Sequence, residues 1–175
     1  MRNLGDTELK RLHREWRRRT TGGLSLLLDS VQTPFNVGAI VRMAAAERVE
    51  HIYLAGATPP PITAKVAKTA LGSERYVAWS QHERLEEAID AVKDAGRFLL
   101  GIELASGALP LHEIPMATDV CLALGHEDRG LSPLTLQACD AVAFVPQLGR
   151  VGSLNVAAAA AIAVYEVRRR EWVGG

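Results

Sequence analysis

Apolar segments alternate with amphipathic segments along most of the chain. Short apolar runs with no polar residue at every second position are typical of strands that are covered on both faces. Strands are predicted at 24–30, 51–56, 75–79, 97–104, 119–125 and 141–147. Apolar residues with a helical period predict helices at 4–19, 36–47, 63–71, 84–96, 132–139 and 154–170. This alternation of strands and helices predicts an α/β fold with a mostly parallel sheet flanked by helices.

Two of the predicted helices carry recognisable start signals. Asn36 is placed to cap the helix that runs to Glu47, and Ser132 precedes Pro133 at the start of a later helix. The alanines that open the last helix give it a thin face, suited to tight packing against the core, a partner subunit, or both.

Charge divides the chain into two parts, although the formal net charge of its 175 residues is zero. Residues 1–20 hold seven basic and three acidic side chains, a local balance of +4. We therefore predict a basic N-terminal helix and linker over 1–22 and a single domain over 23–175. The basic run fits either a solvated helix face or a surface that binds a polyanion.

The two cysteines, Cys121 and Cys139, lie in apolar stretches and have no CxxC spacing. This pattern indicates buried, reduced thiols and no metal site. No signal peptide and no apolar run of membrane-spanning length are recognised, so a cytoplasmic protein without membrane association is expected.

Three polar loops that contain glycine follow predicted strands, at the sheet edge where parallel sheets bind ligands. They read QTPFNVGAIVR, GHEDRGLS and PQLGRVGSLN. The early loop lacks a GxGxxG turn, and no GxxxxGK[ST] string is present. Ser153 lies in VGSLN rather than in a GxSxG elbow, which disfavours a serine hydrolase; His126 and His112 are its candidate bases.

The three strings NVGAIVRMAAA, LALGHEDRGLS and VPQLGRVGSLNVAAAAAIAVYE resemble the three motifs of the SpoU family of RNA 2′-O-methyltransferases. They occur in the order and spacing of that family, and the resemblance extends over about residues 24–170. It implies a SPOUT fold with a deep C-terminal trefoil knot, S-adenosyl-L-methionine as cofactor, and a homodimer whose RNA site is shared between subunits.

The resemblance also implies roles for individual residues. Arg42 engages the ribose 2′-hydroxyl and a phosphate, and Asn36 and Glu127 support it; a guanidinium is too weak an acid to serve as a general base. The implied catalytic set is Arg42, Asn36, Glu127, Ser153 and Asn155. The implied cofactor-binding set is Ile102, Gly125, Val145, Leu148, Ser153 and Leu154. The basic N-terminal helix adds an RNA-binding set of Arg11, Arg14, Arg17 and Arg18, together with Arg42, and Trp16 serves either packing or base stacking.

Within the family, the whole chain is most similar to the TrmH-like enzymes that methylate a tRNA guanosine. A tRNA guanosine in the D-loop is therefore the favoured target, with ribosomal RNA and the tRNA wobble position as alternatives. A non-catalytic RNA-binding module on the same scaffold is a further alternative. Gln147 and Ala157 depart from the family, which often has methionine and serine at these places.

Overall fold

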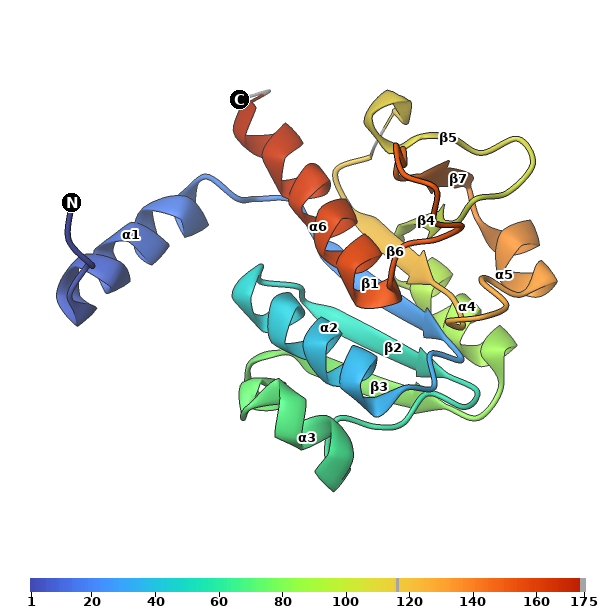
Figure 1. Cartoon of the computed structure of the whole chain (residues 1–175), viewed down its shortest axis with the longest axis horizontal. Helices are drawn as coiled ribbons and strands as arrows, with labels where there is room; N and C mark the ends of the chain where they lie inside the picture. The colour runs from blue at the N-terminus through green and yellow to red at the C-terminus, as the bar shows by residue number, and fades with distance from the viewer. Residues whose placement is uncertain (116, 174–175) are drawn as a thin grey trace.

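The computed structural model describes residues 1–115 and 117–173. A seven-stranded parallel sheet in the order β3-β2-β1-β6-β4-β7-β5 forms its centre (Figure 1). The strands are β1 (Leu24–Asp29), β2 (His51–Ala55), β3 (Ala78–His82), β4 (Phe98–Ile102), β5 (Leu109–Pro110), β6 (Val120–Leu124) and β7 (Ala141–Phe144). The helices are α1 (Asp6–Arg18), α2 (Pro34–Ala46), α3 (Ala64–Ala70), α4 (Leu85–Asp94), α5 (Pro133–Ala138) and α6 (Val156–Val173), with short 3-10 helices η1 (Ser73–Tyr76) and η2 (Leu111–Glu113).

Helices cover both faces of the sheet. Every residue of β1 and β6 is buried, as their uninterrupted apolar runs predict. Alternate residues of β1 enter different cores: Leu26 packs with α2, α3 and α6, whereas Leu27 packs with α4 and α5. The predicted α/β class is thus confirmed, and the knot stays a prediction.

Four segments differ from the sequence-based expectation. The predicted strand 75–79 is a 3-10 turn followed by β3, which starts at Ala78. The loop after β4 contains β5 and η2, which are too short to show a periodic pattern. The assignment of Asn36 as a helix cap is wrong, because α2 begins at Pro34 after an extended Thr33. The last helix begins at Val156 rather than at 154. Proline suits the first helical position because its φ angle is already helical and its missing N–H has no partner there.

Helix α1 extends away from the sheet and buries none of its residues (Figure 1). Its contact with the domain is aromatic: the rings of Trp16 and Trp172 lie 4.9 Å apart between centroids. No helix in the described part of the chain is both long and apolar enough to cross a membrane.

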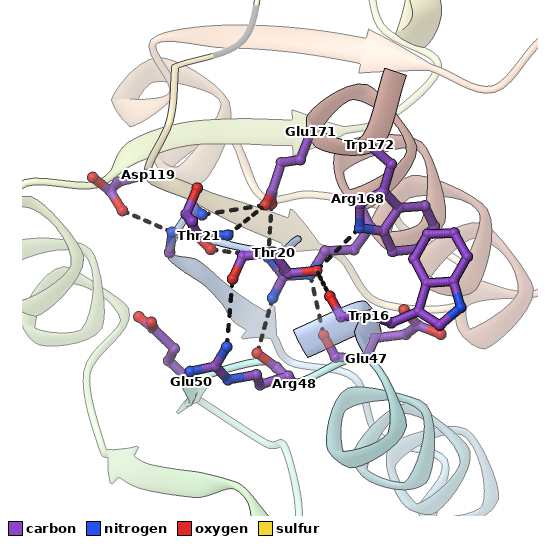
Figure 2. A network of polar contacts seen from close by, with 12 residues as sticks. Trp16, Thr20, Thr21, Glu47, Arg48, Glu50, Asp119, Arg168, Glu171 and Trp172 are labelled. Carbon is purple, nitrogen blue, oxygen red and sulfur yellow. Dashed lines mark hydrogen bonds and ion pairs between the residues drawn. The ribbon is translucent and has the colours of Figure 1, made fainter. Parts of the chain in front are cut away.

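The linker behind α1 is fastened by a buried arginine of α6 (Figure 2). Arg168 is 1% exposed and donates hydrogen bonds to the backbone oxygens of Gly22, Glu47 and Arg48 at 2.9, 3.1 and 2.9 Å. Its charge is balanced by Glu171 at 2.8 Å, which also accepts hydrogen bonds from the N–H groups of residues 21 and 22. One guanidinium therefore joins the linker, the end of α2 and the last helix.

Replacement of this arginine should destabilise the whole domain. We expect Arg168→Ala to lower the free energy of unfolding by about 3 kcal/mol, because three carbonyls and a carboxylate lose their buried donor. The neighbouring Arg169→Ala removes only a half-exposed ion pair with Glu166 and should have a much smaller effect. Urea denaturation of both variants measures this difference, and equal effects would contradict the anchoring role.

Candidate active site

A cavity of about 280 Å³ lies at the carboxyl ends of β4, β6 and β7, beside the start of α6. The ends of parallel strands meet at one edge of a sheet, so loops distant in the sequence are brought together there. The lining residues are Ile102, Glu103, Leu104, Leu124, Gly125, His126, Glu127, Asp128, Arg129, Gly130, Phe144, Val145, Gln147, Ser153, Leu154, Val156 and Ala159.

The cavity contains most of the predicted cofactor-binding residues. These are Ile102, Gly125, Val145, Ser153 and Leu154. Leu148, the remaining member of that set, is 101% exposed and lies outside the cavity.

The loop after β6 is tightly turned, and glycine is required in it. A side chain at Gly125 would overlap the backbone of Gly130 and Leu131. Gly130 itself has a φ of 68°, a left-handed conformation that other residues rarely adopt. Paired hydrogen bonds between the backbones of His126 and Gly130, at 3.0 and 2.8 Å, close the turn. The part of the cavity wall formed by this turn is therefore built from backbone.

A chain of hydrogen bonds connects the three motif loops. The Glu127 carboxylate accepts hydrogen bonds from the N–H groups of Gln32 and Thr33, at 3.1 and 2.9 Å, and from the Asn36 side-chain amide at 2.9 Å. The Asn36 side-chain oxygen accepts a hydrogen bond of 2.9 Å from the Asn155 amide. We call this set, Glu127–Asn36–Asn155, the polar relay. It fixes the loop before α2, the loop after β6 and the start of α6 relative to one another.

Asn155 also caps α6. Its side-chain oxygen accepts hydrogen bonds from the N–H groups of Ala157 and Ala158 at 2.9 and 3.3 Å. The capping and site interpretations of this residue are therefore compatible, because one amide serves both with its two ends.

The polar relay keeps Glu127 ionised. Partial burial raises the pKa of this carboxyl, but hydrogen bonds from Asn36, Thr33 and Gln32 outweigh that effect and lower it to about 2. At neutral pH the group is a pure hydrogen-bond acceptor, which is what its three donors require.

The remaining predicted residues lie elsewhere. Arg42 is exposed on the outer face of α2, on the same side as Phe35, and in the described residues no hydrogen bond or ion pair involves it. One chain therefore does not bring Arg42 to the polar relay. Arg11, Arg14 and Arg18 are exposed along one face of α1, with Arg17 beside them.

Sequence reasoning left several polar residues of the cavity out of its site sets: Glu103 and Gln147, and also His126, Asp128 and Arg129. Glu103 follows β4 and accepts hydrogen bonds from the N–H groups of Leu104 and Leu131 at 2.9 Å each. Gln147 reaches the cavity with a buried side-chain oxygen that has no hydrogen-bond partner among the residues that the structure describes. A polar residue directly after a strand was the available signal for Glu103.

The hydrolase alternative finds no support in the described residues. Ser153 and His126 both line the cavity, but no hydrogen bond joins them, and the His126 Nδ1 accepts a hydrogen bond from the Asp128 N–H at 3.0 Å. His112 lies on η2, beside Glu113. A serine nucleophile needs a base within hydrogen-bond reach.

The thiols are free and buried to different degrees. Burial raises the pKa of Cys121 to about 12 and that of Cys139 to about 11, so both are protonated at neutral pH. The prediction of buried thiols is confirmed for Cys121, whereas Cys139 is only partly buried. Nowhere in residues 1–115 and 117–173 do three His, Cys, Asp or Glu side chains gather as they would to hold a metal ion.

The stability that Glu127 contributes to the fold should be lost at acid pH. Its pKa is lowered on folding from 4.5 to about 2, so its stabilisation is complete above pH 4.5 and is lost as the pH falls towards 2. We expect Glu127→Gln to cost about 1 kcal/mol at pH 7, since solvent screening reduces the effect of a partly open site. The deficit should shrink between pH 4.5 and pH 2 in denaturation experiments; a constant deficit would contradict the ionised role.

Comparison with known proteins places this site in a family. The model of the SpoU rRNA Methylase family matches residues 23–165. The 23S rRNA (guanosine-2′-O-)-methyltransferase RlmB of Coxiella burnetii is 34% identical over 154 residues, covering 88% of this chain and 61% of that protein. The AdoMet-bound rRNA methyltransferase of Sinorhizobium meliloti superposes with a TM-score of 0.80 at 30% identity, covering 86% of this chain and 58% of that one.

A structure concerned with 2-OH methylation of C/U34 on tRNA superposes with a TM-score of 0.77 at 26% identity, covering 88% of this chain and 99% of that one. By contrast, the chain spans only about three fifths of the length of the first two curated relatives that it matches, at 60% and 61%. Motifs, fold and family model agree, and the chain belongs to the SpoU rRNA methylase family.

Proposed function

We propose that this chain transfers a methyl group from S-adenosylmethionine to a ribose 2′-oxygen of RNA. The observation that carries the proposal is the polar relay, which joins all three SpoU motif loops beside one cavity. Similarity to the Coxiella guanosine-2′-O-methyltransferase and to the AdoMet-bound Sinorhizobium structure supports both the reaction and the cofactor.

The residues of the cavity fit S-adenosylmethionine. Ile102, Val145 and Leu154 offer an apolar wall to a purine ring, and the unpartnered Gln147 oxygen suits an amino-group donor such as that of adenine. Three carboxylates, of Glu103, Glu127 and Asp128, lie in the same lining against one arginine, Arg129, and this balance favours a cationic ligand. S-adenosylmethionine, when bound, supplies a methyl group on a positively charged sulfur.

The chain's own residues would then provide alignment. The polar relay holds the start of α6, so that the exposed Ser153 is presented to the cavity on a fixed loop. Arg42 would position the phosphate and the 2′-hydroxyl with its planar fork, which lysine lacks. Correct orientation is the main demand of such a transfer, together with removal of one proton.

A homodimer would complete the site. The outer faces of α2 and α6 expose Phe35, Ile162 and Tyr165 at 64, 43 and 54%, and Arg42 lies on the same outer face of α2. Ala160 and Ala163 are buried against the domain, while Ala158 and Ala161 face outward. A second copy seated on this apolar surface would bring its Arg42 towards the first copy's cavity, which the first copy's own Arg42 does not line.

We infer that tRNA is the substrate. The match over 99% of the chain concerned with tRNA position 34 supports a tRNA substrate and makes that position the alternative to a D-loop guanosine. The Coxiella relative supports 23S rRNA as the competing RNA.

The reaction is tested by incubating the protein with S-adenosylmethionine carrying a tritiated methyl group and either total tRNA or total rRNA. We expect the label in tRNA, on a ribose 2′-oxygen identified by nuclease mapping. Asn36→Ala should reduce the rate at least tenfold, about 1.4 kcal/mol of barrier, because the relay is cut. If the wild-type protein labels neither RNA, the proposed methyltransferase activity is refuted.

The shared site is tested with a heterodimer of an Arg42→Ala chain and an Asn155→Ala chain, each inactive as a homodimer. If Arg42 acts across the interface, one of the two sites has an intact set, and up to half of the wild-type rate returns. If both residues serve the same chain, every site carries a lesion and the heterodimer stays inactive.

A further inference from the structure

A second cavity, of about 420 Å³, lies between α1 and the domain. We call it the α1 groove. It is at the opposite end of α2 from the polar relay, about 18 Å away at the rise of an α-helix from Asn36 to Arg48. Its lining residues are Lys10, His13, Trp16, Arg17, Thr20, Ala45, Ala46, Glu47, Arg48, Tyr76, Arg168 and Trp172.

Aromatic rings form one part of this groove. Trp16 and Trp172 pack together at 58° between their planes, and Tyr165 meets Trp172 edge-on from the outer face of α6. Tyr76 reaches the groove from η1 and is 70% exposed. The Arg75 guanidinium lies over its ring, 5.1 Å from the centroid, and the high exposure of the side chain still leaves open ring surface on the groove.

Hydrogen bonds through Thr20 connect the two tryptophans (Figure 2). The Trp172 indole donates a hydrogen bond of 3.0 Å to the Thr20 hydroxyl, which in turn donates one of 2.9 Å to the Trp16 carbonyl. Arg168 beneath them is fully engaged with backbone oxygens and Glu171. The floor of the groove is thus preorganised.

The rim of the groove is basic. Lys10 and Arg17 come from α1 and Arg48 from the end of α2, against one carboxylate, Glu47. No ion pair involves any of these three cations in the described residues. Positive charge beside exposed ring faces is the combination that binds the phosphates and bases of single-stranded nucleic acid.

Arg48 occupies a position that favours glycine. It follows the last turn of α2 with a φ of 54°, where the absence of a side chain would avoid strain. Its backbone oxygen serves Arg168, a role that any residue can perform. The arginine side chain makes one long, exposed hydrogen bond within the fold, of 3.4 Å to the Thr20 carbonyl, and it also lines the groove with its charge unpaired in the described residues.

We propose that the α1 groove binds an unpaired nucleotide of the substrate RNA, with its base against Tyr76 and the neighbouring phosphates at Lys10, Arg17 and Arg48. The proposal rests on the RNA-modifying function proposed above and adds a contact remote from the reacting ribose. The groove would hold a different segment of the RNA from the one in the cavity.

The role of the positive charge of Arg48 is tested with Arg48→Gly. The affinity for a fluorescein-labelled oligouridylate is measured by fluorescence anisotropy. The unfolding midpoint should stay equal or rise, because glycine relieves the left-handed strain. Binding should weaken, and the slope of log affinity against log salt should fall by about 0.7. Leu71→Gly is the matched control: Leu71 also has a φ of 54°, lies outside the groove and should leave RNA binding unchanged. Wild-type affinity and slope for Arg48→Gly would overturn the proposal.

The stacking role is tested with Tyr76→Ala and Tyr76→Phe. Alanine should weaken oligouridylate binding about tenfold, whereas phenylalanine keeps the ring and should bind as the wild type does. Binding to a blunt RNA duplex should be equal for all three proteins; an equal loss on duplex and oligouridylate would overturn the stacking role.

Failure of this inference can be separated from failure of the proposed function. Calorimetry with S-adenosylmethionine reports on the cavity alone, and tritium transfer from the wild-type protein to total tRNA reports on the reaction. If the wild type methylates RNA but the groove variants bind it normally, the groove proposal fails and the enzyme stands. If the wild type neither methylates nor binds any RNA, the function fails and the groove proposal with it.

Discussion

The carboxylate of Glu127 receives hydrogen bonds from a loop and a helix that lie more than 90 residues before it in the chain. Asn36 passes this connection on to Asn155, and Asn155 ends it on the first N–H groups of α6. The cavity exists in its present shape because these groups satisfy one another: an ionised acceptor, an amide that both donates and accepts, and a helix end in need of a cap. Loss of any one would leave a partner without its hydrogen bond in a site that is partly closed to water.

Much of this arrangement was predictable from the sequence. Uninterrupted apolar runs identify β1 and β6 because both of their faces are buried, and the polar loops that follow such strands must meet at one edge. The start of α2 was not predictable in the same way. Asn36 and Pro34 both carry start signals; the helix begins at Pro34, and the side chain of Asn36, inside the helix, binds Glu127 from a distant loop.

Other features depend on long-range packing and leave little trace in local patterns. Arg168 lies in a run of arginines that reads as a solvated face, yet it is buried while Arg169 is not. Leu148 belongs to the motif of the last loop but lies outside the cavity. The orientation of Arg42 follows from helical spacing alone, because two turns place it with Phe35 and not with Asn36.

Helix α2 connects the two binding regions that we propose. Its first turn belongs to the polar relay, and its end delivers Glu47 and Arg48 to the α1 groove. A helix packed on a sheet is a stiff element, so the distance between the two regions is set by its length. An RNA bound at both regions would have to span this fixed distance.

The buried arginine of α6 has a consequence for how the molecule is made. Its acceptors on Gly22, Glu47 and Arg48 precede it by 146, 121 and 120 residues. During synthesis these carbonyls lack their arginine donor and stay exposed to water until nearly all of the described chain has left the ribosome. Loop closure over such separations is slow. The hydrogen bonds that fasten the linker to α6 therefore form late on the folding pathway.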